Sequence, residues 1–226
     1  MDRSWRRLAM ACCSVASLIG CSPSAAGSNA AVSPPTPPPP AGVAAVRVLQ
    51  LNLCDSGIAA CYTGRSVTEA AAVIRAEAPD LVTLNEACQD DVSILQRSLG
   101  GTAVSAFQAA RDRRTGNAYR CRNGRQYGIG VVSRWPSVPG SSAGAGIYPT
   151  QDGEDPEERA WLCLDVAAAP AVAVCTTHLA YTKREVAAAQ CRYLFGTVVA
   201  RLRAQDGPAP LVVGGNLNLG SGDSPD

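Results

Sequence analysis

Short apolar runs alternate with amphipathic segments from residue 46 onward. Apolar runs of about four to eight residues are typical of buried strands, and apolar residues spaced at i, i+3 and i+4 are typical of helices. The predicted strands are residues 46–52, 81–84, 127–136, 160–166, 171–177 and 211–213. The predicted helices are residues 67–78, 90–99 and 182–204. This order predicts an α/β fold, a four-layer sandwich of two mainly antiparallel sheets with outer helices.

Turn and cap signals set the predicted ends of these elements. Ser66 with Glu69, and Thr182 with Glu185, match the capping box that starts a helix. Pro79 ends the first helix. Gly214 and Gly215 follow the last strand and let the backbone turn sharply and come close to a ligand.

The first 45 residues have a different composition from the rest. Residues 1–7 hold three arginines and residues 8–20 are mostly apolar, which predicts a signal peptide (1–20) too short to span a bilayer. Residues 18–21, Leu-Ile-Gly-Cys, resemble a bacterial lipobox, which predicts lipidation of Cys21. Residues 21–45 would then be a proline-rich linker. The prediction is export to the outer face of the cell membrane as a lipoprotein, or secretion after cleavage near residues 25–26.

Charge is balanced overall but not locally. The formal net charge of +1 gives no global field to recruit nucleic acid. Six arginines fall within residues 111–125: Arg111, Arg113, Arg114, Arg120, Arg122 and Arg125. Two readings of this basic loop remain open: a solvated, disulfide-tied surface loop, or a loop that contacts an anion.

Ten cysteines favour an oxidising compartment. Removing Cys12 and Cys13 with the signal, and Cys21 for lipid, leaves seven. With no C-x-x-C pair and one histidine, a zinc site or a thiol-disulfide protein is disfavoured, and disulfides are predicted. The hairpin of residues 160–177 places Cys163 opposite Cys175. An odd number leaves one thiol unpaired.

Four polar residues stand where predicted strands end: Asn52, Glu86, His178 and Asn216. Singly, each has a plain explanation, such as a turn-forming asparagine, a solvated acid or a structural histidine. Strand ends on one edge of a packed sheet are rigid and can converge. Together the four predict a functional site.

These endings also carry a family resemblance. Residues 214–218, Gly-Gly-Asn-Leu-Asn, are similar to the G-D-x-N signature of the endonuclease/exonuclease/phosphatase superfamily, which comprises metal-dependent phosphoesterases. Residues 51–53, Leu-Asn-Leu, resemble its first motif, and residues 84–86, Leu-Asn-Glu, its L-Q-E motif. Residues 177–179, Thr-His-Leu, and the strand from Tyr127 resemble two more. The resemblance spans residues 46–226.

The resemblance implies a role for each matching residue. Glu86, helped by Asn52, would bind Mg²⁺, with Mn²⁺ or Ca²⁺ as alternatives, because hard cations prefer oxygen ligands. His178 would donate a hydrogen bond to a non-bridging phosphate oxygen. Tyr127 would line the pocket, while Asn52 and Asn218 would contact the substrate. The implied reaction is hydrolysis of a phosphodiester or phosphomonoester by a monomeric enzyme, with nucleic acid or a phospholipid head group as substrate.

Two departures from the pattern qualify the implied activity. Asn216 stands where the family has an aspartate, and an amide has no basic oxygen at neutral pH. The family's closing D-H pair has no counterpart before residue 226. We therefore expect a domain (46–226) that lacks its C-terminal strands and has impaired activity. The alternative is a non-catalytic surface lipoprotein that binds a phosphorylated ligand or a partner.

Overall fold

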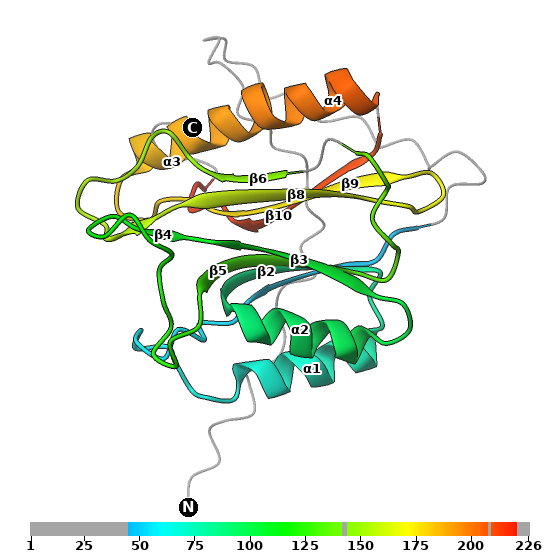
Figure 1. Cartoon of the computed structure of the whole chain (residues 1–226), viewed down its shortest axis with the longest axis horizontal. Coiled ribbons are helices and arrows are strands. Elements are labelled where there is room, and N and C mark those ends of the chain that lie inside the picture. Colours follow the sequence, from blue (N-terminus) through cyan, green and yellow to red (C-terminus); the bar gives the residue numbers. More distant parts are fainter. Residues whose placement is uncertain (1–44, 142–143, 208, 221–226) are drawn as a thin grey trace, which may run out of the picture.

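The computed structural model describes residues 45–141, 144–207 and 209–220. Two four-stranded sheets lie face to face, with helices on the outer face of each (Figure 1). The elements are β1 (Val48–Asn52), α1 (Ser66–Glu77), β2 (Leu81–Cys88), α2 (Gln89–Leu99), β3 (Val104–Ala109), β4 (Arg111–Asp112), β5 (Tyr127–Ser133), β6 (Gly144–Ile147), β7 (Glu157–Glu158), β8 (Ala160–Val166), β9 (Val172–His178), α3 (Arg184–Tyr193), the π-helix η1 (Leu194–Val199), α4 (Ala200–Asp206) and β10 (Leu211–Asn216). The predicted signal peptide, Cys21 and the linker up to residue 44 lie outside the described residues.

The first sheet has the strand order β1-β2-β5-β3. β1 pairs with β2 in parallel, and β5 is antiparallel to both of its neighbours. Helices α1 and α2 cover its outer face (Figure 1). Ile74 of α1 and Leu95 of α2 are almost fully buried against Leu84 of the sheet. The apolar stripe read from the sequence is therefore the face that packs on this sheet.

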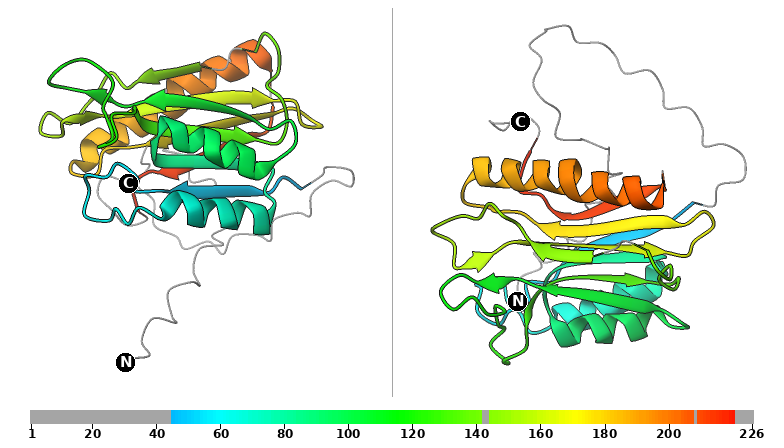
Figure 2. Two further views of the ribbon diagram at one scale, coloured as in Figure 1. Left: turned by 60° about the horizontal axis from the view of Figure 1, so that its bottom comes forward. Right: turned by 45° about the horizontal axis from the view of Figure 1, so that its top comes forward.

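The second sheet has the order β10-β9-β8-β6. β8 and β9 form the predicted hairpin, and β10 adds to β9 in parallel. The run α3-η1-α4 lies along its outer face, and the second panel of Figure 2 shows it as one continuous rod. None of the helices in the described ranges has the length and apolar character needed to cross a membrane.

A hydrophobic core also lies between the two sheets. Leu81 and Val131 of the first sheet pack with Leu162 and Val174 of the second, and all four are buried. Only β1–β2 and β10–β9 are parallel among the described strand pairs. The predicted four-layer sandwich with two mainly antiparallel sheets is confirmed.

Both predicted capping boxes are wrong. Helix α1 starts after Arg65 and α3 after Lys183, and neither has a side-chain cap. Ser66 instead donates its hydroxyl to Asp55 Oδ1 at 2.9 Å, and Thr182 donates to Asp152. Both hydroxyls therefore bond to residues distant in the sequence instead of capping the helix ends.

Two strands had no clear signal in the sequence. The sequence of β3, Val-Ser-Ala-Phe-Gln-Ala, does not alternate strictly between apolar and polar residues. The strand is half-buried along its whole length. β6 consists of Gly-Ala-Gly-Ile, whose small side chains leave room for Trp161. Small residues carry little periodic signal, although the sheet uses them to pack an aromatic ring.

Disulfides connect the described cysteines. Cys163 pairs with Cys175 across the hairpin, as predicted, with a Cα–Cα distance of 4.0 Å. Cys54–Cys61 closes the loop after β1, and Cys88–Cys121 ties the basic loop to the end of β2. Cys191 is also disulfide-bonded, so the expectation of an unpaired thiol is wrong for the described cysteines.

The double glycine lies within β10, not after it as predicted, and allows close packing there. A Cβ at Gly214 would clash with the side chain of Thr83 on the facing sheet. A Cβ at Gly215, whose φ is +145°, would clash with the carbonyl oxygen of Thr177 on β9. The two glycines therefore let the end of β10 lie close to β2 of the facing sheet and to β9 of its own sheet.

Candidate functional site

Asn52 and Glu86 meet at the end of the first sheet. Asn52 is the last residue of β1, and its Nδ2 donates to Glu86 Oε1 at 2.6 Å. The Asn52 Oδ1 accepts the backbone N–H of Cys54 at 3.0 Å. The structure therefore brings these two predicted residues into contact.

Glu86 occupies an irregular point of β2. The predicted strand of 81–84 continues to Cys88, and its register with β5 shifts between Leu84 and Ala87. Glu86 lies in this bulge with a φ of +54°. A left-handed conformation costs a non-glycine residue about 1–3 kcal/mol and persists where the surroundings impose it. The bulge re-aims the carboxylate that a regular strand would have directed elsewhere.

Asn85 connects the two sheets, a role that the sequence did not reveal. Its Oδ1 accepts Gln50 Nε2 at 2.8 Å and the backbone N–H of Asn216 at 3.0 Å. Its Nδ2 donates to the carbonyl of Thr177 at 2.9 Å, and the side chain is fully buried. Because Asn85 precedes Glu86 and Thr177 precedes His178, these bonds hold the ends of β2, β9 and β10 together.

His178 ends β9 and lies in register with Asn216 of β10. Its Nδ1 is 3.1 Å from Arg159 Nη1. A guanidinium can only donate, so Nδ1 is the acceptor and the ring proton is on Nε2. Burial, together with the positive charge of Arg159, lowers the pKa of His178 to about 3. The imidazole is therefore neutral and presents Nε2–H as a donor.

Arg159 is the centre of a buried ionic network that sequence reasoning missed. Its side chain is 3% exposed, and it donates to Asp155 at 2.7 Å and to Glu157 at 2.9 Å. Burial lowers the pKa of Arg159, but the charges of Glu157 and Asp155 outweigh it and raise the pKa above the ordinary value. Burial raises the pKa of Glu157 to about 7, against the opposing effect of Arg159. The network fixes the orientation of His178.

Tyr127 and the two asparagines of the last motif flank these groups. Tyr127 is 5% exposed and hydrogen-bonds to Glu157. Burial raises the pKa of its phenol, and the charge of Glu157 adds to the effect. Asn218 is exposed with a φ of +55°, and its Nδ2 donates to the carbonyl of Leu179 at 2.8 Å. Asn216 is half-buried, and its backbone carbonyl accepts the backbone N–H of Leu179 at 2.9 Å.

The donors at the open side of this site suit a hard cation. Glu86 and Asn52 offer a carboxylate and a carboxamide, the oxygen ligands that Mg²⁺ shares with water. The charge of Glu86 contributes to raising the pKa of Glu157, a repulsion that a divalent cation would relieve. Two groups in the described chain combine cysteine with acidic residues, Cys54-Cys61-Glu86 and Asp55-Cys88-Asp91. Their cysteines are disulfide-bonded, so these groups offer no thiolate for a soft metal.

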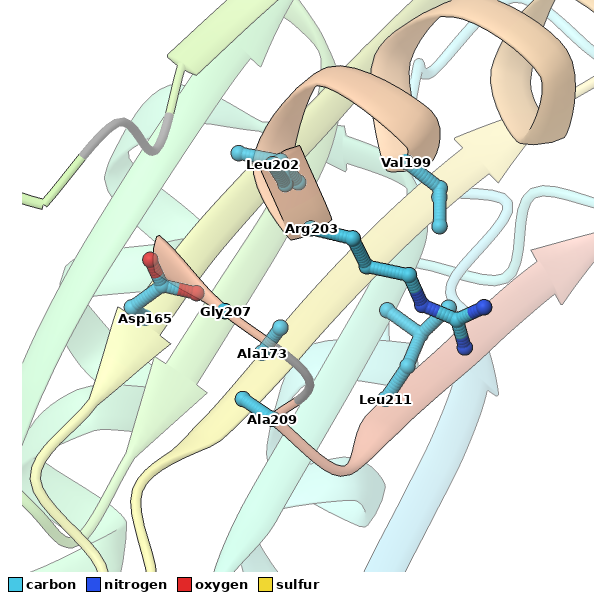
Figure 3. A pocket seen from close by; sticks show the side chains of 8 residues that line it. All are labelled: Asp165, Ala173, Val199, Leu202, Arg203, Gly207, Ala209 and Leu211. Carbon is cyan, nitrogen blue, oxygen red and sulfur yellow. The ribbon is translucent and has the colours of Figure 1, made fainter. Parts of the chain in front are cut away.

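A small cavity lies at the opposite end of the second sheet, between α4 and the starts of β9 and β10. It is lined by Asp165, Ala173, Val199, Leu202, Arg203, Gly207, Ala209 and Leu211 (Figure 3). Its volume of about 10 Å³ is about that of a single water, so this cavity is too small for a phosphate ester.

Comparisons with known proteins identify the family of the chain. The sequence model of the Endonuclease/Exonuclease/phosphatase family matches residues 54–225. No curated protein sequence matches the chain significantly.

Solved structures share the fold. An endonuclease/exonuclease/phosphatase from Beutenbergia cavernae is 27% identical with a TM-score of 0.59, over 80% of this chain and 49% of that one. ANGEL2, a 2',3'-cyclic phosphatase, is 16% identical with a TM-score of 0.56, over 76% and 52%. The mannosyl-6-phosphatase Bt3783 of Bacteroides thetaiotaomicron is 11% identical with a TM-score of 0.55, over 80% and 68%. The present chain thus spans about half the length of the first two. It belongs to the Endonuclease/Exonuclease/phosphatase family.

Proposed function

We propose that the protein hydrolyses phosphate esters with the help of a divalent cation. The observation that carries this proposal is the joining of the two sheets by Asn85, which brings Glu86 and Asn52 to the same end of the sandwich as His178 and Asn216. Family membership supports the reaction class, and ANGEL2 and Bt3783 are both named as phosphatases. Hydrolysis would form a bond from a water oxygen to phosphorus and break the ester P–O bond, and the leaving oxygen would take up a proton.

The residues present divide this work between them. Glu86 and Asn52 would hold the cation, Mg²⁺ or else Mn²⁺ or Ca²⁺, which supplies charge neutralisation and a more acidic bound water. His178 would donate Nε2–H to a non-bridging phosphate oxygen, because Arg159 fixes that tautomer. Tyr127 would line the phosphate pocket, and Asn52 and Asn218 would contact the substrate.

Asn216 limits the rate in this scheme. Its carboxamide can orient a water but cannot accept a proton at neutral pH, and general-base assistance is typically worth ~10²–10⁴ in rate. This observation favours a second candidate function, a non-catalytic protein that binds a phosphorylated ligand through the same groups. Measured turnover separates the two candidates.

The test is hydrolysis of bis(p-nitrophenyl) phosphate and p-nitrophenyl phosphate with Mg²⁺, Mn²⁺ and Ca²⁺ in turn. Glu86→Gln should lower metal-dependent turnover by about 10²-fold or more, and should weaken Mn²⁺ binding measured by calorimetry. Glu77→Gln is the matched control, because Glu77 is an exposed acid on α1. Metal-dependent turnover that survives in Glu86→Gln would reject the assigned cation site. Metal-dependent binding of phosphate without turnover would favour the non-catalytic candidate.

We also propose that the protein is exported and anchored to the membrane through lipid on Cys21. The lipobox of residues 18–21 and the proline-rich stretch behind it support this proposal. Two acyl chains give stable attachment where one is marginal. Cys21→Ala should move the protein out of the membrane fraction of cells, and an unchanged membrane fraction would reject the anchor.

A further inference from the structure

A second concave region lies beside the candidate active site. It is a cavity of about 570 Å³ between the loop after β1 and the basic loop of residues 110–126. Its lining includes Ile58, Arg114, Asn117, Tyr119, Arg120 and Gln126. A volume of this size is in the range of small-molecule sites.

The walls of this cavity are held by backbone bonds and a disulfide. Isolated bridges join Arg111 to Ala118 and Arg120 to Gln126, so the basic loop folds into two small hairpins. The N–H of Arg122 donates to the carbonyl of Ser56 at 2.8 Å, which fixes this loop to the loop after β1. Cys121 is bonded to Cys88, two residues after Glu86. A preformed wall lowers the ordering cost of binding.

One aromatic layer separates the cavity from the catalytic side. The rings of Tyr119 and Tyr127 lie 5.6 Å apart. Tyr119 lines the cavity, and Tyr127 belongs to the candidate site. The contact between the two rings therefore places the cavity next to that site.

The cavity has an excess of positive charge. Arg120 donates Nη1 to the carbonyl of Gly124 at 2.7 Å, and forms no ion pair with a carboxylate in the described parts of the chain. Arg114 is paired with Asp112 at 3.4 Å, and both residues line the cavity. One arginine thus remains to attract an anion.

We propose that this cavity binds a nucleotide adjoining the phosphate that is cleaved, an inference that rests on the proposed function. Arg120 would contact the phosphate of that nucleotide, and the half-buried ring of Tyr119 would stack on its base. Asn117 and Gln126 carry the carboxamides that pair with base edges. Stacking on a side chain requires an unstacked base, so the ligand is single-stranded. A cationic lipid head group would be repelled by Arg120, and an acyl chain would leave these polar groups unsatisfied.

The binding test uses a fluorescein-labelled single-stranded hexadeoxyadenylate in EDTA, followed by anisotropy at several salt concentrations. Arg120→Ala should weaken binding about ten-fold and reduce the salt slope by about one. Tyr119→Leu should weaken binding by about five- to a hundred-fold, while Tyr119→Phe, which keeps the ring, should bind like the wild type. Arg192→Ala removes an exposed arginine from the outer helix α3 and should have no effect.

Several outcomes would overturn the proposal. These are no oligonucleotide binding, binding that ignores both Arg120→Ala and Tyr119→Leu, or preferential binding to phosphatidylglycerol vesicles. Turnover of bis(p-nitrophenyl) phosphate, which has no nucleobase, should be unchanged in Arg120→Ala and so tests the catalytic site separately. Arg120-dependent binding without turnover would reject the proposed hydrolysis and keep the cavity assignment. Turnover without Arg120-dependent binding would support the proposed hydrolysis and reject the cavity assignment.

Discussion

The two halves of the site differ in how firmly their side chains are held. On the first sheet, Asn52 is exposed and Glu86 half-exposed, and a single hydrogen bond joins them. On the second, His178 is 8% exposed and is oriented by Arg159, which is itself paired with two carboxylates. In the proposed function, the carboxylate that would bind a cation needs access to solvent, whereas the imidazole that would donate a hydrogen bond needs a fixed direction. The two sheets differ in the way that these two roles would require.

The largest expected effect tests the absence of a general base at residue 216, beside His178. Asn216→Asp should raise metal-dependent turnover by about 10²–10⁴-fold, because it adds a basic oxygen beside His178. The measurement is kcat on bis(p-nitrophenyl) phosphate at saturating Mg²⁺. Asn123→Asp is the control, since it makes the same change at an exposed asparagine of the basic loop, outside the assigned site. Equal rates for Asn216→Asp and the wild type would show that the missing base is not at residue 216.

Loss of the buried Arg159 side chain should destabilise the part of the site that holds His178. Arg159→Leu leaves Asp155 and Glu157 without their cation, which should lower the free energy of unfolding in urea by about 3–5 kcal/mol. Arg111→Leu breaks an ion pair whose arginine is 46% exposed, so we expect a loss of about 0–1 kcal/mol. Similar losses in the two variants would mean that burial does not distinguish the pairs.

Removal of the Asn85 amide should weaken the connection between the strand ends of the two sheets. Asn85→Ala leaves the N–H of Asn216 and the carbonyl of Thr177 without their side-chain partner, and should lower the free energy of unfolding by about 1–3 kcal/mol. Turnover should fall further than stability, because the strand ends lose their alignment. Asn123→Ala, in the exposed basic loop, serves as the control. Full activity in Asn85→Ala would remove the argument that Asn85 assembles the site.

A pH-dependent effect concerns the proton on His178. The pKa is about 3 in the folded protein and 6.5 when unperturbed, so between these pH values the unfolded chain binds more protons. Stability from this group is complete above pH 6.5 and is lost as the pH falls towards 3, by up to about 1.4 kcal/mol per pH unit. Asp91 and Glu157, whose pKa values are raised to about 7, act in the opposite direction.

A difference curve isolates the histidine from these acids. The free energy of unfolding of wild type minus that of His178→Gln should be flat above pH 6.5 and should fall below it. Glutamine keeps an acceptor for Arg159, so the network is disturbed as little as the substitution allows. Parallel curves from pH 4 to 7 would contradict a buried neutral imidazole.

The sequence predicted the parts of the fold and site that depend on local pattern. Helical spacing located α1 and α2, and apolar runs located the strands whose ends carry Asn52, His178 and Asn216. Asn85 was not assigned a role because its partners are distant in the chain: 92 residues separate it from Thr177. Arg159 pairs with carboxylates only two and four residues away, but its contact with His178 depends on the folded structure. The left-handed conformation of Glu86 had no signal either, since glutamate is not a residue that favours it. Hydroxyl caps failed for the same reason, because Asp55 and Asp152 compete for them.

The amide of Asn85 also ties the appearance of the site to the order in which the chain folds. Its bonds to Thr177 and Asn216 cross residues that are far apart in sequence, and loop closure of this kind is slow relative to local helix formation. An intermediate with only the first sheet formed would hold Glu86 and Asn52 but would have no phosphate donor beside them. In the proposed function, the cation ligands and the phosphate donor would therefore come together only when the two sheets dock.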